Sequence, residues 1–332
     1  MRLDSPPRFG RSAGPPSRPA RSPCVSAWQP AGTYRQSLAV QACDTVAGGP
    51  APGFVNNAAG FRCPAGRSGP RRRQSVTRPA VLVTNDDGVR APGLAALARA
   101  LERDLGAEVT VVAPDREQSG ASHAMTIRSP LRFERVAESW YSVEGTPTDC
   151  VNLAIFHLLD ERPALVVSGI NAGYNLGEDV TYSGTVAGAL EARILGIASL
   201  AVSSAPDASA EDLDAVAAIA ARVAAEVLAR GLPADSLLNV NVPPAPRGIR
   251  LTHQGRRAFR EGLIERRDPK GREYYWIGLA PSEWEPDDGA DHAAIAERYV
   301  SVTPLHSDMT CHRAIPVLSA WGLERLVPGS SR

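Results

Sequence analysis

The sequence contains few of the residues that mark disulfide-rich or membrane-spanning proteins. Only five of its 332 residues are cysteine, and three of these, Cys24, Cys43 and Cys63, lie within the first 77 positions. This count excludes a small disulfide-stapled scaffold and favours a reducing compartment. No run of eighteen apolar residues occurs, so no membrane-spanning helix is expected. The expected location is therefore the cytoplasm.

Lysine is almost absent, since Lys270 is the only one among 36 basic residues. The formal net charge of zero hides a division, because residues 1–78 carry a net charge of +10 and the remainder carries −10. An acidic body argues against nonspecific binding of nucleic acid and suits a site that gathers carboxylates around a cation. We expect neither a nucleic-acid partner nor a membrane partner.

Residues 1–77 form a segment rich in Pro, Gly, Ser, Ala and Arg, with no helical or strand periodicity. This composition predicts a disordered basic extension. Three interpretations remain open: a targeting peptide, a basic interaction tail, or sequence upstream of a true start near Val76. A secretory signal is disfavoured because no apolar stretch follows the first arginines.

A folded domain over residues 78–332 is predicted to begin with a buried strand at Ala80–Thr84. Strands and helices then alternate, which is typical of a Rossmann-like, doubly wound, mostly parallel α/β sheet. The expected strands are 80–84, 109–113, 164–168, 200–203 and 237–242, and the expected helices are 92–105, 149–159, 184–195 and 210–229. Residues 245–310 are expected to form an antiparallel β-hairpin arm, and residues 314–326 a closing helix.

Oxygen-bearing side chains follow several of these strands. Asp86 and Asp87 come after the first strand, Ser119 after the second, and Asn171 after the strand at 164–168. In doubly wound sheets the carboxyl ends of the strands form the ligand-binding edge. Each residue alone suits an ordinary turn or cap, but together they are hard donors for Mg²⁺, Mn²⁺ or Ca²⁺. Zinc is disfavoured because His and Cys are not clustered.

A second candidate feature is the turn Ser183-Gly184-Thr185, which opens the helix expected at 184–195. Its backbone N–H groups and hydroxyls could hold a phosphoryl group. The same tripeptide is also a common helix cap. There is no Walker A lysine, no dinucleotide-binding glycine fingerprint and no nucleophile elbow.

Six motifs resemble the SurE family of survival-protein nucleotidases. They are residues 82–89 (LVTNDDGV), 112–116 (VAPDR), 119–122 (SGAS), 145–151 (GTPTDCV), 167–173 (VSGINAG) and 182–187 (YSGTVA). The resemblance runs from about Val81 to the C-terminus and does not cover the first 77 residues.

The resemblance implies a 5′-nucleotidase that hydrolyses nucleoside 5′- and 3′-monophosphates with one divalent cation per subunit, Mg²⁺ or Mn²⁺. It implies that the metal ligands are Asp86, Asp87, Ser119 and Asn171, the two aspartates being the catalytic residues. It also implies a homodimer or homotetramer built through an exchanged arm and C-terminal helix. We expect Asn175, Ser183, Gly184 and Thr185 to bind the substrate phosphate.

Two alternatives remain at this point. A haloacid-type phosphatase also places Asp after its first strand, but the Asp-x-Asp-x-Thr spacing is missing. A nucleotide-sensing module would bind phosphates without hydrolysing them, and metal-dependent turnover separates it from an enzyme.

Overall fold

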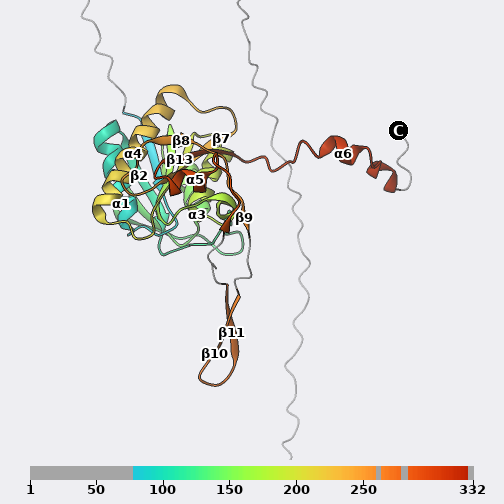
Figure 1. Cartoon of the computed structure of the whole chain (residues 1–332). Helices are drawn as coiled ribbons and strands as arrows, with labels where there is room; N and C mark the ends of the chain where they lie inside the picture. The colour runs from blue at the N-terminus through green and yellow to red at the C-terminus, as the bar shows by residue number, and fades with distance from the viewer. Residues whose placement is uncertain (1–77, 259–262, 278–282, 328–332) are drawn as a thin grey trace, which may run out of the picture. The chain divides into compact units, whose positions relative to one another are not determined.

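The computed structural model describes residues 78–258, 263–277 and 283–327. The chain divides into two units, Met1–Arg71 and Arg72–Arg332, and every described residue lies in the second (Figure 1). The extension expected over residues 1–77 lies outside the described residues. In the described part of the chain, no helix combines the length and apolar character that a membrane crossing requires.

The main sheet has nine strands in the order β3-β4-β2-β1-β5-β6-β7-β13-β8. They are β1 (Ala80–Thr84), β2 (Glu108–Pro114), β3 (Phe133–Ala137), β4 (Trp140–Val143), β5 (Leu165–Ala172), β6 (Ser199–Ser204), β7 (Ser236–Val242), β8 (Ile249–Leu251) and β13 (Val300–His306). All neighbouring strands run parallel except the β3–β4 and β7–β13 pairs. The predicted Rossmann-like α/β fold with a mostly parallel sheet is confirmed.

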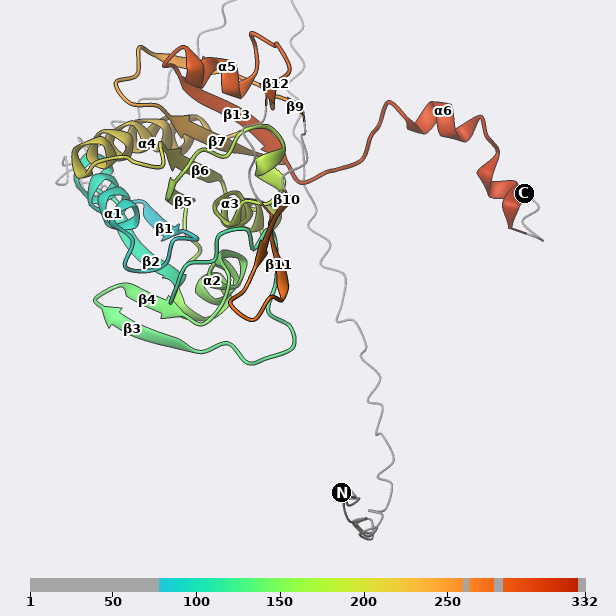
Figure 2. The ribbon, with the colours of Figure 1, turned by 60° about the horizontal axis from the view of Figure 1, so that its bottom comes forward.

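Helices cover both faces of this sheet (Figure 2). The helices of the described residues are α1 (Pro92–Leu105), α2 (Pro147–Leu153), the π-helix η1 (Ala154–Leu158), the 3-10 helix η2 (Gly177–Thr181), α3 (Gly184–Ile194), α4 (Ala210–Arg230), α5 (Asp291–Ala296), α6 (Ile315–Ser319) and the 3-10 helix η3 (Leu323–Leu326). Side chains alternate along β1. Val81 and Val83 therefore pack with α1 and α4, whereas Leu82 packs with α2 and α3.

The topology places a ligand-binding edge beside β1. The chain leaves β1 toward β2 on one side and reaches β5 on the other, so the strand order reverses between β1 and β5. Such a reversal opens a crevice at the carboxyl ends of the strands. The loops after β1, β2 and β5 all begin at this edge.

The C-terminal part differs from the arm expected over residues 245–310. Outside the main sheet, β10 (Leu263–Arg267) pairs with β11 (Glu273–Ile277), and β9 (Arg257–Ala258) pairs with β12 (Glu283–Trp284), both antiparallel. The strands β8 and β13 instead belong to the main sheet. The reason is burial, because Val300 and Val302 pack into the core shared with α1 and α4.

The closing helix expected over residues 314–326 is divided. The structure has α6, then Gly322 in the left-handed conformation with φ 63°, then η3. Large apolar side chains of this segment are exposed, among them Val317 and Trp321. Those of the β10–β11 hairpin, such as Leu263 and Trp276, are exposed as well. These two segments therefore present apolar surface.

Candidate active site

Asp86 and Asp87 lie at the carboxyl end of β1, in the crevice beside β5. Asp86 is buried, and its backbone oxygen accepts a hydrogen bond of 2.7 Å from the N–H of Gln118 in the loop after β2. The N–H of Ala172, at the end of β5, donates to Oδ2 of Asp87 over 3.3 Å. The two loops and the end of β5 that carry the predicted metal ligands thus meet around the two aspartates.

The first turn of α3 packs directly against Asp86. The Thr185 hydroxyl donates to Oδ1 of Asp86 in a short hydrogen bond. A Cβ atom on Gly184 would lie 2.8 Å from the Cβ of Asp86 and 2.9 Å from its Oδ2. Only glycine permits this approach, so the predicted phosphate-binding turn and the predicted metal ligand lie side by side.

The pKa values of both aspartates are raised. Burial raises the pKa of Asp86, although the hydrogen bond from Thr185 opposes the shift. Burial, followed by the negative charge of Asp86, raises the pKa of Asp87 to about 6. Burial and the repulsion between the two neighbouring carboxylates thus impose an energetic penalty on their charged forms. A divalent cation between them would compensate it.

Glu117 is a third acidic residue at the site, and the sequence analysis missed it. Its negative charge contributes to the raised pKa values of Asp86 and Asp87. Its Oε1 accepts a 2.9 Å hydrogen bond from the Ser119 hydroxyl. Because Ser119 donates its proton to Glu117, the lone pairs of its oxygen remain to face a cation. The sequence feature that could have identified Glu117 is its position two residues before Ser119, a candidate ligand.

Asn171 is oriented in a way that suits a ligand of a cation. Its Nδ2 donates to the backbone oxygen of Gly173 over 2.7 Å, so the amide oxygen is the atom that could ligate a cation. At the same edge, the buried Oδ1 of Asn85 and Oγ of Ser168 accept no hydrogen bond from the described residues. Unpartnered oxygens of this kind fit a site completed by an ion and its water.

The donor set fits a hard divalent cation. Two carboxylates, one hydroxyl and one amide oxygen are the ligands that Mg²⁺ and Mn²⁺ prefer. Among the described residues, no group of three or more His, Cys, Asp or Glu side chains is placed to hold a metal. The predicted set of ligands contains only two acidic side chains, Asp86 and Asp87.

Asn175 is less accessible than its predicted role suggests. It is buried, its backbone N–H donates to Oδ1 of Asn241 over 2.8 Å, and its backbone oxygen accepts from Asn239 over 2.8 Å. Its own Nδ2 donates to the Ser203 hydroxyl over 2.9 Å. One N–H of the amide group remains for a phosphate oxygen.

Ser183 caps α3, because its Oγ accepts a 3.0 Å hydrogen bond from the N–H of Val186. Its hydroxyl proton can still be donated to a ligand. The side chain also lines a cavity of ≈ 650 Å³ whose walls include Val186, Leu190 and Leu305. This turn thus joins the acidic crevice to an adjacent, largely apolar cavity.

His123 and Cys150 lie in settings that suit a structural role. The Nε2 of His123 lies 2.7 Å from Oε2 of Glu191, whose other oxygen accepts from Asn152. Cys150 is fully buried and reduced, and burial raises the pKa of its thiol well above the usual value. Neither geometry forms a nucleophilic triad.

Known proteins resemble this chain closely. A family model described as "Survival protein SurE" matches residues 81–261. The protein "5'-nucleotidase SurE" of Pelobacter propionicus is 52% identical over 245 residues, which are 73% of this chain and 98% of the relative. The protein of the same name from Geobacter sulfurreducens is 49% identical over 252 residues, 75% of this chain and 95% of the relative.

A solved structure shares the fold. The crystal structure of the SurE protein from Aquifex aeolicus is 42% identical in sequence, with a TM-score of 0.66. The match covers 74% of this chain and 100% of that chain. The similarity therefore spans the whole of the compared protein.

Proposed function

The chain belongs to the SurE family of survival proteins, and we propose that it is a divalent-metal-dependent phosphomonoesterase that converts nucleoside 5′- and 3′-monophosphates to nucleoside and phosphate. It is a hydrolase of the 5′-nucleotidase class. The observation that carries the chemistry is the contact between Asp86 and the first turn of α3. That contact supports the proposal, because Asp86, a proposed cation ligand, lies against the turn proposed to bind the phosphate.

Asp86, Asp87, Ser119 and Asn171 would hold the cation, Mg²⁺ or Mn²⁺. When bound, it would neutralise charge on the phosphate and on the two aspartates. The first N–H groups of α3 have no partner within the helix, and those of Gly184 and Thr185 would donate to phosphate oxygens. The hydroxyl of Ser183 and the remaining N–H of Asn175 would hold the phosphate from the side.

Water completes the reaction by in-line attack on phosphorus. A bond forms between the water oxygen and phosphorus, and the ester P–O bond breaks with its electron pair staying on the nucleoside oxygen, which takes up a proton that the attacking water releases. Phosphoryl transfer of this kind depends mainly on positioning and charge neutralisation. The acidic crevice and the α3 turn supply these two requirements.

Phosphate release from a panel of nucleoside monophosphates tests the proposal. We expect release with Mn²⁺ or Mg²⁺, loss of release after EDTA, and recovery when the cation is restored. Nucleotide binding without release at any cation concentration would contradict the proposal and favour the sensing module. Nothing in the comparisons favours that alternative.

We also propose a homodimer or homotetramer that acts in the cytoplasm. The exposed apolar side chains of the β10–β11 hairpin and of α6 support an assembly with a second copy. The two cysteines of the described region, Cys150 and Cys311, are unpaired, which suits a reducing compartment. Light scattering of the purified chain tests the first proposal and cell fractionation the second.

A further inference from the structure

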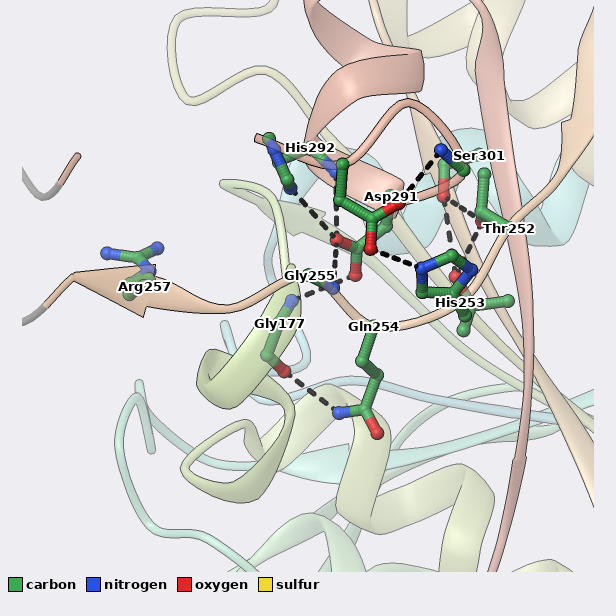
Figure 3. A network of polar contacts seen from close by, with 12 residues as sticks. Gly177, Thr252, His253, Gln254, Gly255, Arg257, Asp291, His292 and Ser301 are labelled. Atoms are coloured by element: carbon green, nitrogen blue, oxygen red, sulfur yellow. Dashed lines mark hydrogen bonds and ion pairs between the residues drawn. The ribbon is translucent and has the colours of Figure 1, made fainter. Parts of the chain in front are cut away.

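The fully buried carboxylate of Asp291 joins three segments that are far apart in the sequence (Figure 3). Its Oδ2 accepts a 2.8 Å hydrogen bond from the N–H of Gly177, at the start of η2. Its Oδ1 accepts 2.9 Å and 2.8 Å hydrogen bonds from the N–H groups of Gly255 and His292. A carboxylate that accepts three backbone N–H bonds holds the three segments firmly together, because hydrogen bonds to a carboxylate are stronger than those between neutral groups.

The backbone around Gly177 is shaped to reach this carboxylate. Gly177 has φ 52°, and a Cβ atom there would lie 2.7 Å from the backbone oxygen of Gly255 and 2.8 Å from the ring of Trp284. On the other side of the same residue, Nε2 of Gln254 donates to the Gly177 oxygen over 2.9 Å. Both polar groups of the Gly177 backbone are therefore held by side chains from other segments.

Further contacts surround the hydrogen bonds of Asp291 and Gly177. The ring of Trp284 stacks on His292, with 4.6 Å between centroids and 3° between planes. The Arg257 guanidinium lies 4.5 Å from the centroid of the Trp284 ring and forms an ion pair with Asp179. Arg257 and Trp284 belong to β9 and β12, which pair with each other. This strand pair is thus attached to η2.

The helix η2 lies between the candidate phosphate-binding residues. Asn175 precedes Gly177 by two residues, and Ser183 follows the end of η2 by two. The same segment also supports the loop of Ser119, because the Ser122 hydroxyl donates to the Thr181 oxygen over 2.7 Å and the Ser122 N–H donates to the Tyr182 oxygen over 3.1 Å. A displacement of η2 would therefore move both flanks of the phosphate site.

We infer that Asp291 is a positioning residue for the nucleotidase reaction, which fixes η2 through Gly177 and thereby holds the phosphate-binding residues on either side of it. This inference rests on the proposed function. Asp291 touches neither the predicted cation ligands nor the predicted phosphate ligands, so its effect passes through the backbone of η2. Loss of the Asp291 carboxylate should lower the affinity for phosphate more than the affinity for the cation.

The test uses the full chain with the substitution Asp291→Asn. An amide offers one acceptor oxygen and turns an N–H group toward the N–H donors, so at least one of the three bonds is lost. We expect the inhibition constant of inorganic phosphate to rise about tenfold, in line with the loss of a bond to a charged group. The Mn²⁺ dissociation constant, measured by calorimetry without nucleotide, should rise less than the phosphate constant, because only Ser119 among the four proposed cation ligands lies on a loop that η2 supports.

Two further variants complete the test. Asp287→Asn removes a carboxylate four residues away that pairs with His253 at the surface over 2.8 Å, and it should leave both constants unchanged. Gln254→Glu places a carboxylate against the Gly177 oxygen and should raise the phosphate constant in the same direction as Asp291→Asn. If Asp291→Asn does not fold, the phosphate inhibition constant of Gln254→Glu tests the inference in its place.

The outcomes separate positioning from simple destabilisation. A loss of folded protein lowers the apparent kcat but leaves the phosphate inhibition constant unchanged. A phosphate constant equal to the wild-type value in a folded Asp291→Asn enzyme, or in Gln254→Glu where Asp291→Asn does not fold, overturns the inference. Failure of the proposed function looks different, because the unsubstituted chain would then release no phosphate at all.

Discussion

Asp86 and Asp87 are neighbours at the end of one strand, where two carboxylates repel each other unless a positive charge or hydrogen bonds compensate them. The structure supplies hydrogen bonds from Thr185 and Ala172, yet the pKa values of both side chains stay raised. A site in this state binds a cation more favourably than it would bind an anion alone.

Glu117 should strengthen cation binding without touching the phosphate. Its carboxylate accepts the Ser119 proton over 2.9 Å and adds negative charge near the two aspartates. We expect Glu117→Gln to raise the Mn²⁺ dissociation constant about tenfold, as is typical for partners of metal ligands. Calorimetry measures this constant directly.

The matched control is Glu108→Gln. This substitution removes an exposed carboxylate at the first residue of β2, whereas Glu117 lies in the loop that follows the other end of that strand. It should bind Mn²⁺ as the unsubstituted chain does. Equal Mn²⁺ affinity in Glu117→Gln and Glu108→Gln would show that Glu117 does not orient Ser119.

The residues of the site could be predicted from sequence only where they lie at or just after the end of a predicted strand. Asp86 and Asp87 follow the buried strand β1 and Asn171 lies near the carboxyl end of β5, and parallel strands bring these ends to one edge. Asp291 shows the limit of this reasoning. It follows no strand of the sheet, and its partners at Gly177 and Gly255 lie 114 and 36 positions away. Only the folded chain reveals that it faces η2.

At the scale of elements, Ser183 at the N-terminus of α3 has two proposed roles, as helix cap and as phosphate ligand. The cap of a second helix, α4, allows the two roles to be tested separately. Ser183 caps α3, and Ser209 caps α4 through a capping box with Asp212. We expect Ser183→Ala and Ser209→Ala each to lower the free energy of unfolding by about 1 kcal/mol, the usual effect of losing a cap. Chemical denaturation measures both values.

Only Ser183→Ala should also raise the inhibition constant of inorganic phosphate, because α4 packs against α1 on the other face of the sheet. A phosphate constant that rises equally in both variants would mean that lost stability, and not the Ser183 hydroxyl, causes the change.

Among the elements, sequence patterns predicted the parallel core better than the C-terminal region. A strand buried on both faces is a continuous apolar run, as in β1, and its identity is evident from the chain alone. The strand β13 contains Ser301 and Thr303, which are buried and bonded to Thr252. Because polar residues interrupt its apolar pattern, the sequence placed it in the arm, whereas burial of Val300 and Val302 places it in the main sheet.

For the whole molecule, residues 78–332 should suffice for the reaction. The matched relatives are covered over 95% to 98% of their own length by 245 to 252 residues of this chain, and the family match begins at residue 81. We expect a fragment of residues 78–332 to show the kcat/KM of the full chain for the same nucleotide. A large loss in the fragment would assign residues 1–77 a part in the reaction.

The central claim is that the acidic crevice at the end of β1 carries out phosphate-ester hydrolysis, and Asp87→Asn tests it most directly. The measurement is kcat for a nucleoside monophosphate at saturating Mn²⁺, beside Asp115→Asn, an exposed carboxylate after β2 at the same edge. We predict that Asp87→Asn loses at least about a hundredfold in kcat, because the cation and phosphate are no longer held together, while Asp115→Asn keeps the activity of the unsubstituted chain. Full activity in folded Asp87→Asn would contradict the account.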